Sequence, residues 1–429
     1  MSPLEITVPV MEWMLEAPLI VLLVGATLGV LLEAVVPREY RYPAQTGLAM
    51  LTVLAAMGFT AYNWVGGDFK IVAPGSIAVD GPTYFFWSLL LLVGLGGVAL
   101  FAERAVAGGV SAFAASAATV PGSPMEREAE RQHREHTEIF PLILFALFGM
   151  LLFVAANDLL TLFVALEIFS LPLYLLSGMA RRRRWLSQEA ALKYFLLGAF
   201  SSAFFLFGVA LLYGYAGAFS YAGVAQAIVA DESPQVLLLA GLVMLAVGLL
   251  FKVGAVPFHT WTPDVYTGAP TPVTGFMAIA TKTAAVAALL RVFYVALGGA
   301  RWDWQPIIAT VAVATMVVGA VVGLVQQDIK RLLAYSSIAH AGFILAGFVA
   351  AVGATAEGGV SSVGSISFYL LAYGFATLGG FGIITMVRRA GGEANGIAAW
   401  RGLGRTSPFV AGVMTLFLLS FAGIPLTAG

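Results

Sequence analysis

Long apolar runs separated by short polar segments are the dominant pattern of this 429-residue chain. Each run is about 20 residues long, enough for an α-helix to cross a hydrocarbon core about 30 Å thick. Lipid offers no partner to backbone N–H and C=O groups, so each run has to be helical. The pattern predicts an all-α polytopic membrane protein with eleven full spans and the start of a twelfth at Pro408. The predicted full spans are residues 17–36, 45–65, 83–103, 139–156, 158–179, 190–213, 235–256, 272–297, 306–325, 332–352 and 366–387. The first run is too long for the apolar core of a cleavable signal, and acidic rather than basic residues precede it.

The distribution of charge supports this span assignment. The chain is 60% hydrophobic and 10% charged, whereas soluble proteins carry about 25% charged residues. Numbering the spans places sixteen basic residues on one side and only Lys70 and Arg301 on the other. By the positive-inside rule the first side is cytoplasmic and the N-terminus lies outside. The sixteen are Arg38, Arg41, Arg104, Arg127, Arg131, Arg134, Arg181, Arg182, Arg183, Arg184, Lys330, Arg331, Arg388, Arg389, Arg401 and Arg405.

A few ionisable residues lie inside the apolar runs. Each costs about 2.5 to 3.5 kcal/mol on insertion scales, so such residues usually pair, face a bundle interior or line an ion path. Glu167 lies nine residues after Asp158 in NDLLTLFVALEIFSLPLYLL, which is about 14 Å along a helix and near the bilayer centre. A static ion pair is the alternative role for Glu167. The basic residues inside runs are Lys193, Lys252, Lys282 and Arg291.

Two lysines flank a proline-rich segment. Lys252 begins the stretch KVGAVPFHTWTPD, and a helix broken around Gly254 and Pro257 would free carbonyl groups beside its ammonium. Snorkelling of Lys252 to the cytoplasmic interface is the alternative. Lys282 lies ten residues after Pro272, about 15 Å along the next helix and near its middle. We therefore predict that Lys282 is buried.

Lys193 and His340 are weaker candidates. Glu189 stands four residues before Lys193, a spacing that allows either an interfacial ion pair or a place on a proton path. His340 has Ser336 and Ser337 about one turn below it. The histidine titrates near neutral pH in water and its hydroxyl neighbours suit a relay, although a buried structural histidine has the same pattern.

Two further basic side chains have simpler interpretations. Arg291 lies near the outer end of its span, where snorkelling is an equal possibility. His259 lies in the proline-rich segment, and we interpret it as a structural residue near the cytoplasmic side.

These residue types together favour proton transfer. Burial penalises the ammonium form of lysine, so a buried lysine releases its proton readily, and a nearby glutamate can hold or release it. The chain has no cysteine, which excludes thiolate-bound iron–sulfur clusters, disulfides and cysteine-bearing zinc sites. It also has no P-loop or dinucleotide fingerprint. We predict no cofactor-binding and no metal-binding residues.

The chain also contains a degenerate internal repeat. Lys252 and the GAVP motif follow Glu167 by 85 residues, and Gly423 of the GIP motif follows His340 by 83. An odd number of spans per unit would invert one copy relative to the other, a signature of transporters with broken helices. The predicted divisions are 1–138 for the N-terminal spans and a charged cytoplasmic loop, 139–300 for the first repeat, and 301–429 for the second, incomplete repeat.

Five segments carry a resemblance to a known family: ANDLLTLFVALEIFSLPLYLL, EAALKYFLLGAFSSAFFLFGVALLYG, FKVGAVPFHTWTPDVYTGAPTPVTGFMAIATK, QQDIKRLLAYSSIAHAGF and SFAGIPLTAG. From about Glu138 onward the chain resembles the antiporter-like subunits of respiratory complex I, the proton-pumping NADH–quinone oxidoreductase. The motif TPDVYTGAPTPV is the most specific part of the resemblance. It differs from the corresponding motif of the two larger antiporter-like subunits and from that of cation/proton antiporter subunits. Residues 1–100 match less well, and the loop 103–138 is longer than usual.

The resemblance implies an antiporter-like fold of about fourteen spans with two inverted five-helix repeats and broken helices. It implies that Glu167, Lys252 and Lys282 occupy the family's glutamate, broken-helix lysine and central relay lysine positions. Lys193 and His340 match further positions of the intramembrane polar chain. The family continues with a lysine in the second broken helix and two more spans. The outlet half of a proton path is therefore not represented in these 429 residues. Either further chain follows Gly429 or that half is lost.

The implied function is proton translocation in the membrane arm, coupled to electron transfer from NADH to quinone in other subunits. Flavin, iron–sulfur clusters and quinone are expected in those subunits and none in this chain. The implied partners are other membrane-arm subunits, the lipid bilayer, protons and ordered water, without nucleic acid, in a bacterial inner membrane. Two alternatives remain open at this point: a stand-alone cation/proton antiporter, and a non-pumping structural subunit whose charges form static pairs.

Overall fold

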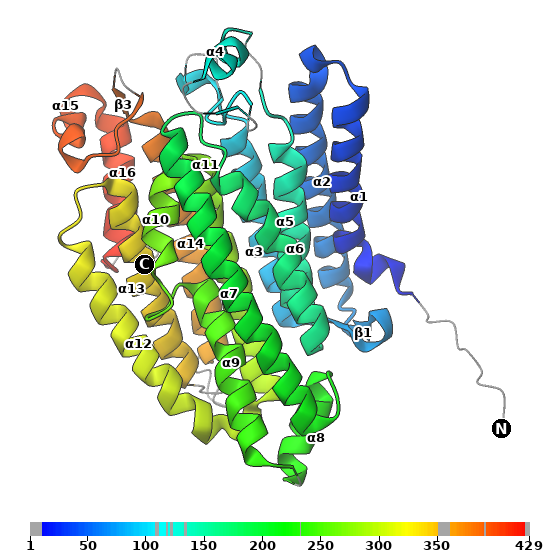
Figure 1. Cartoon of the computed structure of the whole chain (residues 1–429). Helices are drawn as coiled ribbons and strands as arrows, with labels where there is room; N and C mark the ends of the chain where they lie inside the picture. The colour runs from blue at the N-terminus through cyan, green and yellow to red at the C-terminus, as the bar shows by residue number, and fades with distance from the viewer. Residues whose placement is uncertain are drawn as a thin grey trace.

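Long, roughly parallel helices form most of the molecule (Figure 1). The computed structural model describes residues 11–107, 111–116, 119–120, 123–132, 135–231, 233–350, 361–389 and 392–424. The long helices are α1 (Trp13–Val35), α2 (Arg38–Gly66), α3 (Gly81–Phe101), α5 (Ile139–Ala155), α6 (Leu159–Ser177), α7 (Arg184–Ala216), α9 (Gln235–Val253), α11 (Thr271–Arg291), α12 (Arg301–Gly323), α13 (Ile329–Ala350) and α14 (Ser362–Met386). The shorter helices are α4 (Pro124–Arg131), α8 (Tyr221–Ala230), α10 (Trp261–Gly268), α15 (Leu403–Thr406) and α16 (Pro408–Phe421).

The predicted all-α membrane fold is confirmed. Every predicted run contains a helix, and ten helices of the described residues are long and apolar enough to cross a membrane. Helix α5 fills the fourth predicted run but has only 17 residues, so a total of eleven full spans stays a prediction. The division into two inverted repeats stays a prediction as well. Two small antiparallel hairpins, β1 (Lys70–Val72) with β2 (Ile77–Val79) and β3 (Arg388–Arg389) with β4 (Gly392–Glu393), were not predicted.

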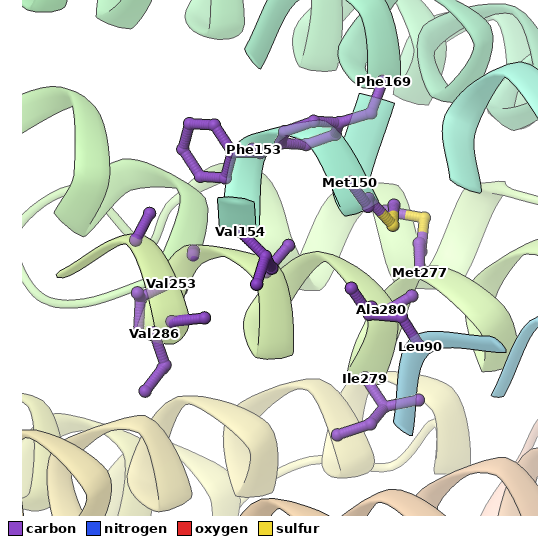
Figure 2. Packing of buried hydrophobic residues seen from close by; sticks show 14 of the residues in the cluster. Leu90, Met150, Phe153, Val154, Phe169, Val253, Met277, Ile279, Ala280 and Val286 are labelled. Carbon is purple, nitrogen blue, oxygen red and sulfur yellow. The ribbon is translucent and has the colours of Figure 1, made fainter. Parts of the chain in front are cut away.

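Helix α11 is the centre of the bundle. All residues from Thr271 to Leu290 are buried, and the helix packs against α3, α5, α9 and α14. Figure 2 shows Met277 and Ile279 of α11 among side chains from neighbouring helices. The stretch TKTAAVAALL is rich in small residues, which let helices approach closely in a membrane protein. Any polar side chain in the middle of α11 therefore faces protein and not lipid.

The predicted helix break follows α9. Gly254 ends this helix with φ +79°, a left-handed conformation that side-chain-bearing residues adopt only with strain. A Cβ there would also lie 2.9 Å from Thr262 Oγ1. The chain then runs through residues 255–260 into the eight-residue α10 before α11 begins. Helix α16 ends in a similar way, with Gly423 at φ +68°.

The two ends of the bundle differ in charge. The loop before α7 and the β3–β4 hairpin carry many of the arginines assigned to the cytoplasmic side. Helices α4 and α15 lie at this end, and α8 and β1 lie at the opposite end (Figure 1). Two members of the basic set are nevertheless buried, Lys330 at 2% exposure and Arg184 at 6%. Arg184 forms an ion pair with Glu126 at 3.2 Å, which draws its side chain inward.

The position of Arg291 shows that one of the two interpretations of its sequence position, snorkelling to the surface, is wrong. Instead of extending to the outer surface, its guanidinium donates two hydrogen bonds to Asp80, at 2.9 and 2.8 Å, and a third to Thr83 at 2.7 Å. Asp80 caps α3 by accepting from the backbone N–H of Thr83. The fork geometry of arginine suits such a bidentate pair. The contact joins the end of α11 to the start of α3.

We expect Asp80→Ala to destabilise the protein by about 2 kcal/mol, less than the roughly 3–5 kcal/mol of a fully buried pair because Asp80 is 40% exposed. Burial raises the pKa of Asp80, but the Arg291 guanidinium outweighs burial and lowers this pKa below its usual value. A carboxyl of lowered pKa contributes its stability above the unfolded pKa and loses it as pH falls through the folded one. The loss of stability caused by Asp80→Ala should thus be constant from neutral pH down to about pH 5 and become smaller below about pH 4.

Thermal denaturation of the purified protein measures this loss of stability. Lys70→Ala is the matched control, because Lys70 and Glu12 form an exposed pair at 3.0 Å that should contribute nothing measurable. Equal thermal stability of Asp80→Ala and the wild type would show that the contact between α11 and α3 does not stabilise this end of the bundle.

Candidate functional site

Lys252 lies in the last turn of α9, directly before the break. Its side chain is buried at 2% exposure, and its Nζ donates a hydrogen bond of 2.7 Å to Ser170 Oγ on α6. Among the described residues this is its one hydrogen bond, and no carboxylate lies within 4 Å. The structure therefore shows Lys252 inside the bundle and not extended to an aqueous interface.

Aromatic rings surround the Lys252 ammonium. Four ring centroids lie between 5.3 and 5.9 Å from Nζ. Rings at this distance attract a cation through their quadrupoles, most strongly where water is excluded. Such an enclosure can stabilise the ammonium form of lysine. It can also surround the neutral amine, because the rings contain no charged acceptor that would then lose its partner. The rings belong to Phe169, Tyr174, Tyr194 and Phe251.

Glu167 lies on the same face of α6 as the serine that binds Lys252. Glu167, Ser170 and Tyr174 are spaced three and four residues apart, which places them on one face of a helix. The carboxylate atom Oε1 is buried and has no hydrogen-bond partner among the described residues. Glu167 is also the charged group that acts on the Lys252 ammonium electrostatically. No described ion pair joins Glu167 to Lys252, so the two groups can interact electrostatically without being held in contact.

Lys282 is buried at the middle of α11, as predicted. Its Nζ donates to the backbone oxygen of Ser337 and, at 2.6 Å, to Ser337 Oγ on α13. His340 follows Ser337 by three residues on the same helix, and its Nδ1 shares a hydrogen bond with the Tyr369 hydroxyl of α14. The Tyr373 ring lies near both groups, with its centroid 5.6 Å from Lys282 Nζ and 4.6 Å from the His340 ring centroid. The structure therefore brings Lys282 and His340 into one polar cluster.

A cavity of about 290 Å³ adjoins this cluster, with His340, Tyr369 and Tyr373 in its wall. Phe421 and Gly423, from the end of α16, line its other side. Most of its wall is apolar, and His340, Tyr369 and Tyr373 supply polar groups on one side. Gly423, with its left-handed backbone, thus lies beside His340, as the left-handed Gly254 lies beside Lys252.

Lys193 has different surroundings. Its Nζ forms ion pairs with Glu189 at 2.7 Å and Asp264 at 2.8 Å, and its side chain is 43% exposed. Arg331 binds the second oxygen of Asp264 at 2.8 Å. Burial raises the pKa of Asp264, but the hydrogen-bonded Lys193 and Arg331 outweigh burial and lower it. The ion pair expected from the sequence is present, and a place for Lys193 on a proton path stays a prediction.

Several polar residues of the site were missed from the sequence. Ser170 could have been found, because it follows Glu167 by three residues on the same helix face. Asp264 could have been found as the only acid of the TPDVYTGAPTPV segment. Nothing in the sequence around Tyr369 and Tyr373 indicates that their hydroxyls belong to the site. His259, interpreted as structural, has a buried Nδ1 without a partner among the described residues.

Comparison with known proteins places this arrangement in a family. Residues 156–429 match the family described as NADH:quinone oxidoreductase/Mrp antiporter, TM. The subunit named NADH-quinone oxidoreductase subunit N from Nocardioides sp. is 56% identical over 98% of this chain and 81% of that relative. The protein of the same name from Cutibacterium acnes is 56% identical over 99% of this chain and 80% of that relative.

Solved structures show the same fold. A chain of respiratory complex I from Thermus thermophilus with bound aureothin matches with a TM-score of 0.73 and 34% identity, over 96% of this chain and 80% of that one. A chain of the Mrp complex from Dietzia sp. matches with a TM-score of 0.77 over 97% of this chain and 72% of that one. Its identity of 23% shows a shared fold alone.

Proposed function

Since this chain belongs to the NADH:quinone oxidoreductase/Mrp antiporter family of membrane proteins, we propose that it translocates protons as a membrane-arm subunit of a NADH–quinone oxidoreductase. The observation that carries the proposal is Lys252, a buried lysine at a helix break. Glu167, one helical turn from its hydrogen-bond acceptor, is coupled to it without an ion pair. A static structural pair would be hydrogen-bonded on both sides, as Arg291 and Asp80 are.

Proton movement begins with the Glu167–Lys252 interaction. With an effective dielectric constant of 20, two unit charges attract by about 4 kcal/mol at 4 Å and about 2 kcal/mol at 8 Å. When Glu167 is close, it stabilises the Lys252 ammonium; when Glu167 moves away or is neutralised, the lysine releases its proton. The difference of about 2 kcal/mol, together with the desolvation of the ammonium, is comparable with the roughly 3.5 kcal/mol needed to move one charge against 150 mV.

The released proton moves along α11 towards Lys282. Helix α9 packs directly on α11, and Lys282 is bonded to Ser337, one turn from His340. The Lys282 amine and the His340 imidazole can each accept and then donate a proton. Hydroxyl groups and water connect the two side chains. The 290 Å³ cavity at His340 receives the proton on the far side of the cluster.

The setting of the chain follows from its relatives and its charges. We place it in a bacterial inner membrane, with the arginine-rich loops in the cytoplasm and the N-terminus outside. Other subunits of the complex supply NADH oxidation, flavin, iron–sulfur clusters and quinone reduction. The absence of cysteine from the sequence supports this division, because clusters are held by cysteine thiolates.

Purification by a tag on this chain tests the proposal. From native membranes we expect the chain to co-purify with subunits that oxidise NADH and reduce quinone, and to pump protons when the complex is reconstituted. Isolation without NADH-oxidising subunits, together with cation/proton exchange in vesicles, would instead support a stand-alone antiporter. The high identity to proteins named subunit N favours the first outcome.

A further inference from the structure

A second cavity, of about 540 Å³, lies at the arginine-rich end of the bundle. Its wall comes from the α6–α7 loop, the α10–α11 junction, the start of α13 and the β3–β4 hairpin. Among the described residues, five cationic side chains line it against a single carboxylate, that of Glu393. That carboxylate already accepts a hydrogen bond of 2.5 Å from Thr271 Oγ1. The five cations are Arg181, Arg182, Arg183, Lys330 and Arg388.

The cavity wall also contains buried polar groups with spare hydrogen-bonding capacity. Lys330 is 2% exposed, and its Nζ, which has three hydrogens to donate, makes one described hydrogen bond, to the Ala269 carbonyl at 2.7 Å. Asn395 is 6% exposed, and its side-chain Oδ1 has no partner among the described residues. The same holds for Arg388 Nε. Buried polar atoms are normally paired, so these atoms have hydrogen-bonding capacity that a ligand in the cavity can use.

Two long helices begin at this cavity. Arg183 and Pro270, which precede α7 and α11, both line it, and neither caps its helix with a side-chain hydrogen bond. The positive end of each helix dipole therefore lies at the cavity wall. Arg183 also adopts a left-handed backbone conformation, with φ +55°. The helix ends and the five cations favour the same kind of ligand, an anion.

We propose that this cavity binds a phosphate group that also carries a hydrogen-bond donor. The phosphate oxygens accept from the Arg182 and Arg388 guanidiniums, whose forked geometry suits phosphate, and from the Lys330 ammonium. A P–OH hydrogen or a headgroup hydroxyl donates to Asn395 Oδ1. Cytoplasmic inorganic phosphate and an anionic phospholipid headgroup such as phosphatidylglycerol both present this chemistry. Bound there, the anion also offsets the mutual repulsion of the five cations.

Two binding measurements on the intact complex distinguish the sources. In the first, equilibrium dialysis with radiolabelled inorganic phosphate compares wild type with Arg182→Gln and Arg388→Gln. In the second, the complex is purified from nanodiscs of mixed phosphatidylglycerol and phosphatidylcholine, and its retained lipid is counted by mass spectrometry. Arg182 is exposed, so its variant should fold even if Arg388→Gln does not. Arg405→Gln, an exposed arginine of the same side outside the cavity, is the control.

Each cavity variant should weaken binding in one of the two measurements by about tenfold, the value of one charge-assisted hydrogen bond. Weaker phosphate binding identifies soluble phosphate as the ligand, and loss of retained phosphatidylglycerol identifies the headgroup. Sites in other subunits cancel in the difference between variant and wild type. If both measurements are the same for the wild type, the cavity variants and Arg405→Gln, the cavity binds no phosphate and the proposal is wrong.

Discussion

Complexes that carry Lys252→Met are expected to lose proton translocation and, with it, most NADH oxidation. Methionine keeps the length of the side chain among the four aromatic rings but can neither hold nor release a proton. Loss of a positioned proton-transfer group slows such steps by about 100-fold or more. Because electron transfer is coupled to pumping, NADH oxidation should fall with it. Both are measured together on the complex reconstituted in sealed vesicles.

The outcome for Lys252→Met separates the possible roles of the lysine. Lys70→Met is the matched control, because Lys70 is exposed at the other end of the bundle and should leave both rates unchanged. A less stable complex with an unchanged number of protons per electron pair would mean that Lys252 is structural. Unchanged rates in an intact complex would mean that the coupling of Glu167 to Lys252 has no part in translocation.

Lys282→Met should stop the path at its next step. Lys282 makes its hydrogen bonds to Ser337 alone among the described residues, and no acidic group pairs with it. Removing the ammonium therefore leaves no buried carboxylate without a partner. It also removes the free-energy cost of desolvating a buried charge. We expect assembly to survive while proton pumping falls by about 100-fold or more.

Ser337→Ala provides a graded comparison for Lys282→Met. The alanine variant removes one of the two acceptors of Lys282 and keeps the backbone oxygen. Its expected effect on pumping is smaller, about tenfold, as for one charge-assisted hydrogen bond. Proton uptake and NADH oxidation in sealed vesicles measure both variants. An effect of Ser337→Ala equal to that of Lys282→Met would place the serine hydroxyl, and not the lysine, at the centre of the relay.

The membrane fold could be predicted because its cause is local. Solvation by lipid or water acts on each segment separately, so long apolar runs had to be helices. Their approximate ends, the break at Gly254 and the burial of Lys282 all followed from the order of residues along one helix. The small helices α8 and α10 were missed because they are short and lack the length signal of a membrane span.

The candidate site could be predicted only in part. Glu167, Lys252, Lys282 and His340 were found because an ionisable residue in an apolar run is costly wherever the helix lies. The role of Lys193 was left between two alternatives, and the structure shows its ion pair with Glu189 and Asp264. No local feature of the sequence showed which of these side chains would meet.

Partners across the bundle were decided only by tertiary packing. Lys252 and Ser170 are 82 residues apart in the chain, Lys282 and Ser337 are 55 apart, and Arg291 and Asp80 are 211 apart. Lys330 looked like a loop residue, and it is buried because the start of α13 packs against the α10–α11 junction. The sequence determined which residues are costly to place in a membrane, since that cost depends on the segment alone. Tertiary structure decided which groups stabilise them, since the partners come from other helices.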